Sequence, residues 1–166
     1  MSDGLTGRLS TELLALHQAR ESFPLWTSRG LPDGTIHSAG ISLLTALGQA
    51  LGYEAYCEIP TPHKGRYAHV GDDVRSGWGW FDRNTGCPVL LAEFERYSGQ
   101  IDESGLMTKV KNLLLAHHRW GELAECLVLA YWTESLRDLP DHDALAQAFR
   151  RGFQTRAMEP VSSVRL

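Results

Sequence analysis

The stretch that most constrains the fold is an apolar run from Val89 to Ala92, which Pro88 opens and Glu93-Phe94-Glu95 ends. Such a run is typical of a strand that is covered on both faces, as in the middle of a sheet. Side chains alternate along a strand, so the two glutamates leave on one face and Phe94 leaves on the other. Two carboxylates therefore share a small volume at the end of a buried strand, which is costly without a compensating cation. A divalent metal ion with oxygen ligands is one such cation.

A second strand is predicted from His69 to Phe81, and the residues from Asp82 to Gly86 form a turn cluster after it. We therefore expect the two strands to form an antiparallel hairpin. The start of the first strand then lies beside the end of the second, which predicts that Asp73 lies near Glu93 and Glu95. One ion could then touch at least two of these carboxylates.

The rest of the chain predicts helices and strands around this hairpin. Helices are expected at about 10–23, 38–51, 103–118 and 141–153, and further strands at 54–59 and 126–132. The order helix, helix, strand, strand, strand, helix, strand, helix predicts an α/β fold with a mixed central sheet flanked by helices on both faces. The tail, 154–166, is expected to be mobile or to serve as an interaction segment.

Length and composition predict a single domain over residues 1–166, with enough hydrophobic residues, 43%, for a real core. We divide it into an N-terminal helix and loop (1–35), a central unit (36–135) and a C-terminal helix and tail (136–166). The polar N-terminus and the lack of a long apolar run predict a cytoplasmic protein. The net charge of −4 disfavours a protein that only coats nucleic acid, but it does not exclude an enzyme that cuts it.

The pattern of residues 36–135 resembles the PD-(D/E)xK nuclease superfamily, which has the restriction-endonuclease-like fold. The resemblance lies in an aspartate at the start of a strand, a hairpin turn, an apolar strand ending in an acidic triplet, then a helix and another apolar strand. It implies that 36–135 is a nuclease-like core in which Asp73 and Glu93 bind Mg²⁺ or Mn²⁺. Glu95 stands where the family usually has a lysine, and Asp72 stands where it has a proline.

Because Glu95 replaces the motif lysine, the positive charge that catalysis needs must come from elsewhere. Lys109 and Lys111 flank the buried stripe of the following helix, and one of them, Lys109 first, is expected to point toward the glutamates. The expected catalytic set is therefore Asp73, Glu93, Glu95 and Lys109. Each has a plainer interpretation: a solvated strand end for the glutamates, a turn for Asp73, and the wet edges of a helix for the lysines.

The resemblance implies a magnesium-dependent endonuclease that hydrolyses phosphodiester bonds of a nucleic acid, DNA before RNA. A homodimer would allow both strands of a duplex to be cut in one event. The alternative is a degenerate nuclease-fold protein that binds nucleic acid or a protein without cutting, which the missing lysine favours. Asp72 competes with Asp73 for the metal position, Glu58 could join from the preceding strand, and Trp78 and Trp80 are expected to pack in the core.

Overall fold

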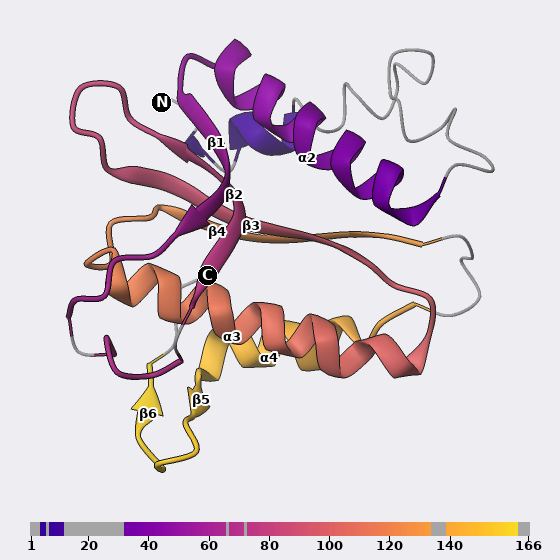
Figure 1. Ribbon diagram of the computed structural model, residues 1–166, viewed down its shortest axis with the longest axis vertical. Helices are drawn as coiled ribbons and strands as arrows, with labels where there is room; N and C mark the ends of the chain where they lie inside the picture. The colour runs from indigo at the N-terminus through magenta and orange to yellow at the C-terminus, as the bar shows by residue number, and fades with distance from the viewer. Residues whose placement is uncertain are drawn as a thin grey trace.

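The protein is an α/β structure with a mixed four-stranded sheet flanked by helices (Figure 1). This computed structural model describes residues 4–5, 7–11, 32–65, 67–71, 73–133 and 139–162. The sheet contains, in spatial order, β1 (Glu54–Pro60), β2 (Arg75–Phe81), β3 (Pro88–Arg96) and β4 (Cys126–Trp132). Helix α2 (Asp33–Ala50) covers one face, and α3 (Glu103–Arg119) and α4 (His142–Arg151) cover the other. The predicted fold class is confirmed at this level.

The predicted hairpin is present. β2 pairs antiparallel with both β1 and β3, and the β2–β3 register places Trp78 opposite Ala92. Asp82 holds the turn between them, since its carboxylate accepts hydrogen bonds from the backbone N–H groups of Asn84 and Thr85. After β3, a short 3₁₀ segment, η2 (Gln100–Asp102), leads into α3, and β4 returns parallel to β3.

The face under α2 is packed by aromatic side chains of the sheet. Trp78 and Trp80 are fully buried there, as predicted, and the Trp80 indole donates to the carbonyl of Leu44 in α2. The helix carries glycines where these rings approach, because a Cβ at Gly40 would overlap the Phe94 ring and one at Gly48 would overlap the Trp80 ring. Small residues in α2 thus let the helix lie close to the sheet.

The opposite face is packed by apolar side chains of the two later helices. Leu91, Val110 and Leu114 are completely buried there. α4 begins after Asp141, whose carboxylate accepts from the Ala144 N–H at 2.9 Å, as expected of an N-cap. No helix in the described ranges is both long and apolar enough to cross a membrane.

Three elements begin at other residues than predicted. The helix predicted at 38–51 begins at Asp33, directly after Pro32, whose ring favours a helix start. The strand predicted from residue 69 begins only at Arg75, and residues 67–71 form turns and bends instead. Of the helix predicted at 10–23, the described residues 5 and 7–11 are helical, so it starts earlier than predicted, and residues 12–23 lie outside the described ranges.

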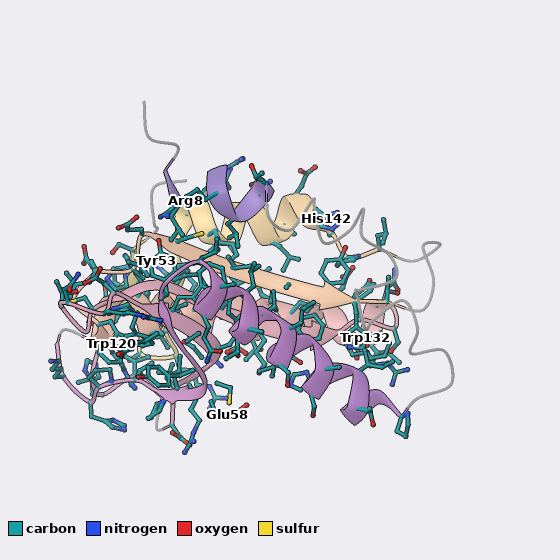
Figure 2. All side chains as sticks on the ribbon, turned by 90° about the horizontal axis from the view of Figure 1, so that it is seen from above. Arg8, Tyr53, Glu58, Trp120, Trp132 and His142 are labelled. Atoms are coloured by element: carbon teal, nitrogen blue, oxygen red, sulfur yellow. The ribbon has the colours of Figure 1, made fainter. Side chains whose placement is uncertain are left out.

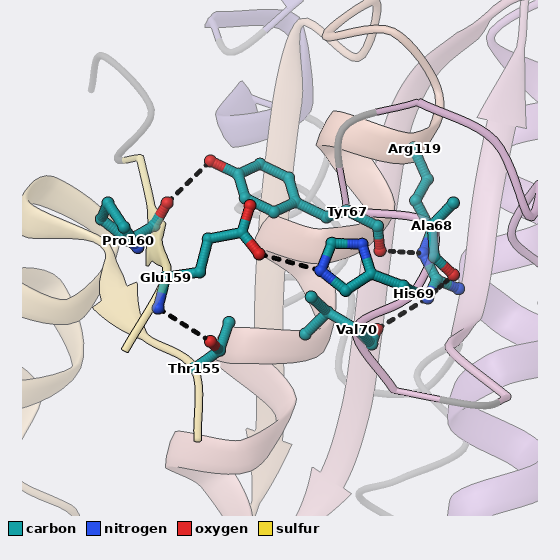
Figure 3. A network of polar contacts seen from close by, with 8 residues as sticks. All are labelled: Tyr67, Ala68, His69, Val70, Arg119, Thr155, Glu159 and Pro160. Atoms are coloured by element: carbon teal, nitrogen blue, oxygen red, sulfur yellow. Dashed lines mark hydrogen bonds and ion pairs between the residues drawn. The ribbon is translucent and has the colours of Figure 1, made fainter. Parts of the chain in front are cut away.

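A single buried arginine explains why β2 starts late. Arg119, at the end of α3, is 1% exposed. It donates to the backbone carbonyls of Tyr67, Ala68 and Val70 (Figure 3). It also donates to the Thr61 hydroxyl and to the carbonyl of Gly71. Because these carbonyls all turn toward one side chain, the connection between β1 and β2 wraps around the guanidinium instead of running on as an extended strand.

The tail contradicts the expectation of mobility as far as it is described. β5 (Phe153–Gln154) pairs antiparallel with β6 (Pro160–Val161), and Val161 is buried. The hairpin is fastened to the β1–β2 connection by a bond from the Tyr67 hydroxyl to the Pro160 carbonyl, 2.8 Å, and by the pair of His69 and Glu159, 2.9 Å (Figure 3). Residues 163–166 lie outside the described ranges.

Candidate functional site

The two glutamates of β3 meet a lysine from α3. Glu93 and Glu95 leave the same face of β3, as the alternation predicts, and this face lies against α3. The Lys109 ammonium is 2.8 Å from Glu95 Oε1 and 3.4 Å from Glu93 Oε2. We call Glu93, Glu95 and Lys109 the carboxylate–lysine cluster. Lys109 therefore points its ammonium toward the glutamates, as predicted.

The charges in this cluster are strongly coupled. Burial raises the pKa of Glu93 to about 7, although the Lys109 charge acts in the lowering direction; the charges of Glu95 and Glu58 raise it further. Glu93 is only 3% exposed, so burial dominates. Burial also lowers the pKa of Lys109, but its bonds to Glu95 and Glu93 outweigh this, and the net pKa lies above the usual value. The lysine is therefore held as a cation between the two carboxylates.

A glycine leaves space beside the buried carboxylate. One step beyond the Trp78–Ala92 pair, the register brings Gly77 of β2 opposite Glu93. A Cβ at Gly77 would lie 3.1 Å from Glu93 Oε2, closer than ordinary van der Waals contact, so the carboxylate occupies the room that a side chain at this position would need. On the other side of Gly77, β1 carries Glu58, which has a left-handed backbone with φ 52°. Its charge reaches Glu93, as the raised pKa shows.

Asp73 does not join the cluster in the predicted way. Its carboxylate pairs with Arg75 at 2.8 Å, and both side chains are more than half exposed. Asp73 precedes Gly77 by four residues, a distance of about 13 Å along an extended strand, and the chain leaves the ladder before Arg75. Among the described residues, no three histidine, cysteine or acidic side chains gather so as to hold a metal ion. The rival Asp72 lies outside the described residues.

The second candidate lysine faces elsewhere. The Lys111 ammonium stands 5.7 Å from the centre of the Phe153 ring, a cation–π contact that draws it to the tail hairpin. Val110, between the two lysines, is fully buried. The helix phase therefore sends Lys109 to the sheet end and Lys111 to the tail.

Two carboxylates of the predicted metal site, those of Glu93 and Glu95, do come together, around the Lys109 ammonium. Glu93 and Glu95 both lie within 3.4 Å of one ammonium nitrogen, so the point between them already accommodates positive charge. Carboxylate oxygens are the ligands that magnesium and manganese prefer. Glu93 and Glu95 are thus the two residues that could hold such an ion, while Asp73 would have to leave Arg75 to contribute.

Two polar side chains near this site were missed from the sequence. The Tyr131 hydroxyl lies 2.7 Å from His142 Nε2, and Tyr131 is the register partner of Glu95 on β4. A sequence signal for this pair did exist. Tyr131 lies at the end of a predicted strand, and His142 lies at the start of the helix predicted to follow it. Side chains at these two ends share one edge of a sheet with parallel strands.

Comparison with known proteins finds no family model, no curated protein and no solved structure that matches the chain. The resemblance of residues 36–135 to the PD-(D/E)xK nucleases therefore rests on its motif and on the order of its elements.

Proposed function

We propose that the protein is a metal-dependent nuclease with the restriction-endonuclease-like fold. The observation that carries the proposal is the position of Lys109, whose ammonium reaches both Glu93 and Glu95 from the helix that follows their strand. The motif has glutamate where a lysine is usual, and a lysine from the next helix supplies the missing charge at the same point. The element order α2-β1-β2-β3-α3-β4, with β4 parallel to β3, supports the fold assignment.

The cluster residues take distinct roles in this proposal. Glu93 and Glu95 would hold a magnesium or manganese ion, which, when bound, neutralises charge on a phosphoryl group and lowers the pKa of a bound water. Lys109 Nζ donates hydrogen bonds to the developing negative charge on the phosphoryl oxygens. Glu95 is the more exposed of the two carboxylates, and its oxygen that does not hold the ion would accept the proton of the attacking water.

A second candidate has its own supporting observation. The carboxylate of Asp73 is occupied by Arg75, and no three-residue metal group occurs among the described residues. A degenerate member of the same fold, which binds nucleic acid or a protein without cutting, is consistent with such an incomplete ligand set. The Asp73–Arg75 pair is exposed to solvent and therefore weak, so metal binding could still draw Asp73 away from Arg75.

Cleavage assays separate the two candidates. Labelled DNA and RNA, single- and double-stranded, are incubated with the protein and magnesium or manganese. The nuclease proposal expects cleavage that a chelator and the substitution Glu93→Gln both abolish, because the amide keeps the shape of the side chain but loses the charge. Cleavage that survives both treatments points to a contaminant.

Asp73→Asn tests the remaining part of the predicted ligand set. We expect it to reduce cleavage less than Glu93→Gln does, since Asp73 pairs with Arg75 and Glu93 belongs to the cluster. Failure of the well-folded wild type to cut any of the substrates would reject the nuclease proposal and favour the degenerate one.

A further inference from the structure

The carboxyl ends of the two parallel strands lie side by side, and each leads toward a helix. β3 is followed by α3, and β4 by α4 (Figure 1). In parallel α/β sheets, ligands bind beyond the carboxyl ends of adjacent strands, where the loops and helix starts converge. The cluster occupies the β3 half of this edge. The β4 half carries the pair of Tyr131 and His142, which plays no part in the packing of either core.

Tyr131 lies on the same face as the cluster. It pairs in register with Glu95, and paired residues of adjacent strands point to the same side of the sheet. Its ring contacts the Tyr97 ring at 6.0 Å between centroids, and Tyr97 comes from the β3 side of the edge. Side chains two residues apart along a strand share one face, so Glu93, Glu95 and Tyr97 lie in a row on this face. Tyr131 contacts the end of the row.

His142 completes the pair from the first turn of α4. Its Nε2 is 2.7 Å from the Tyr131 hydroxyl, and the imidazole is exposed. Figure 2 shows His142 and Trp132, the last residue of β4, toward the same side of the molecule. Because His142 is exposed and Tyr131 only partly buried, water could satisfy both groups, and stability does not require that they bond to each other. A bond this short at an open position instead orients both groups.

The chemistry of the pair suits an acceptor-rich ligand. Burial raises the pKa of Tyr131, so its phenol keeps its proton at neutral pH and can donate it to His142 Nε2. The imidazole then carries its own proton on Nδ1, and this N–H is the donor left for a ligand, while Tyr131 orients the ring. A phosphodiester offers only acceptor oxygens to a hydrogen-bond donor such as this N–H.

We propose that Tyr131 and His142 form a phosphate-binding subsite that holds a phosphodiester next to the one at the carboxylate–lysine cluster. The inference rests on the proposed function, because it takes the ligand to be a nucleic-acid strand that runs across the carboxyl edge from β3 to β4. The subsite binds and positions the strand and takes no part in the bond-breaking step. Its loss should therefore raise KM and leave kcat nearly unchanged.

Binding is measured in the Glu93→Gln background, so that cleavage cannot interfere. The probe is a fluorescently labelled single-stranded DNA of about ten nucleotides, with RNA of the same sequence in a parallel series. Adding His142→Gln should weaken binding by about tenfold, the effect of one lost hydrogen bond to a charged group. Adding Tyr131→Phe should weaken binding too, because the imidazole loses the bond that orients it. Both substitutions keep the size of the side chain, and thermal unfolding checks that the variants are folded.

Matched controls come from the other side of the molecule. Tyr56→Phe removes an exposed hydroxyl that donates to Glu54 on β1, and His69→Gln removes the imidazole that pairs with Glu159. Neither control should change DNA binding. The inference is overturned if Tyr131→Phe and His142→Gln bind as tightly as their parent, if the controls weaken binding equally, or if the parent does not bind the probe.

Kinetics in the wild-type background keep this inference distinct from the nuclease proposal. If the wild type cuts DNA and the two variants show unchanged KM, the subsite is wrong and the nuclease proposal stands. If the wild type cuts nothing, but binding is lost in both subsite variants and not in the controls, the subsite stands and the protein belongs to the non-cutting alternative.

Discussion

Lys109 donates to Glu95 across 2.8 Å, from the middle of α3 to the end of β3. The same ammonium is 3.4 Å from the nearly buried Glu93. The Lys109 ammonium of α3 thus offsets the negative charge of Glu93 and Glu95, which lie close together because side chains two residues apart leave the same face of β3. Without it, the Glu93 carboxylate would have to be protonated or hydrated inside the protein.

The first prediction tests whether this ammonium acts in catalysis. Lys109→Met should reduce cleavage by about 10²- to 10³-fold, the usual effect of removing one donor that stabilises transition-state charge. Lys111→Met is the matched control, because Lys111 lies two residues away on the same helix and faces Phe153. Its activity should stay close to wild type. Equal losses in the two variants would argue against a specific role for Lys109.

The second prediction concerns the pH dependence of stability in the presence of a chelator. The folded-state pKa of Glu93 is about 7, against an ordinary value of 4.5. The folded protein therefore binds more protons than the unfolded chain between these values, so the free energy of unfolding falls as pH rises through this window and levels off above it. The contribution is at most about 3 kcal/mol.

Urea unfolding of wild type and Glu93→Gln across this pH range measures the effect. Glutamine does not titrate, so subtracting the variant removes the contributions of all other groups to a first approximation. The wild type should lose stability relative to the variant as pH rises, and the variant should be the more stable of the two near pH 7 and above. If the wild type instead keeps or gains stability relative to the variant as pH rises, Glu93 ionises at least as easily as an exposed glutamate.

Local patterns were enough to predict the sheet and its helices. β4 has the predicted bounds, and α3 differs from its prediction by one residue, because apolar runs and helical periodicity are written in neighbouring residues. The meeting of Glu93 with Glu95 follows from alternation alone. The direction of Lys109 needed only the helix phase and the order of the elements.

The position of Asp73 could not be predicted in this way. It depends on where β2 begins, and that is decided by Arg119, which is 48 to 52 residues away along the chain from the carbonyls it binds. Hydrogen bonds between residues so far apart in the sequence produce no periodic pattern from which they could be predicted. The pair of Tyr131 and His142 was missed for a related reason, since it forms only when the end of β4 and the start of α4 are brought to one edge.

The third prediction tests the close packing of the Glu93 carboxylate against Gly77. Gly77→Ala places a methyl group about 3.1 Å from Glu93 Oε2, which is closer than ordinary contact, so the carboxylate must shift away from β2. We expect at least tenfold slower cleavage with a stability loss of about 1 to 3 kcal/mol, as for other overpacked sites. Gly34→Ala in α2 is the control, because a Cβ there meets open space. Unchanged activity in Gly77→Ala would mean that this close packing is not needed.

The last prediction concerns the arginine that shapes the β1–β2 connection. Arg119→Met leaves the carbonyls of residues 67, 68, 70 and 71 without their buried donor, so the free energy of unfolding should fall by about 3 kcal/mol or more. Arg119→Lys keeps a cation but has fewer donors, and should lie between wild type and the methionine variant. Arg151→Met, on the exposed side of α4, should cost less than about 0.5 kcal/mol. Urea denaturation gives these values, and hydrogen exchange should show faster opening at residues 67–71 in the lysine variant. A loss below about 1 kcal/mol in Arg119→Met would mean that water replaces the guanidinium and that the connection holds its shape by itself.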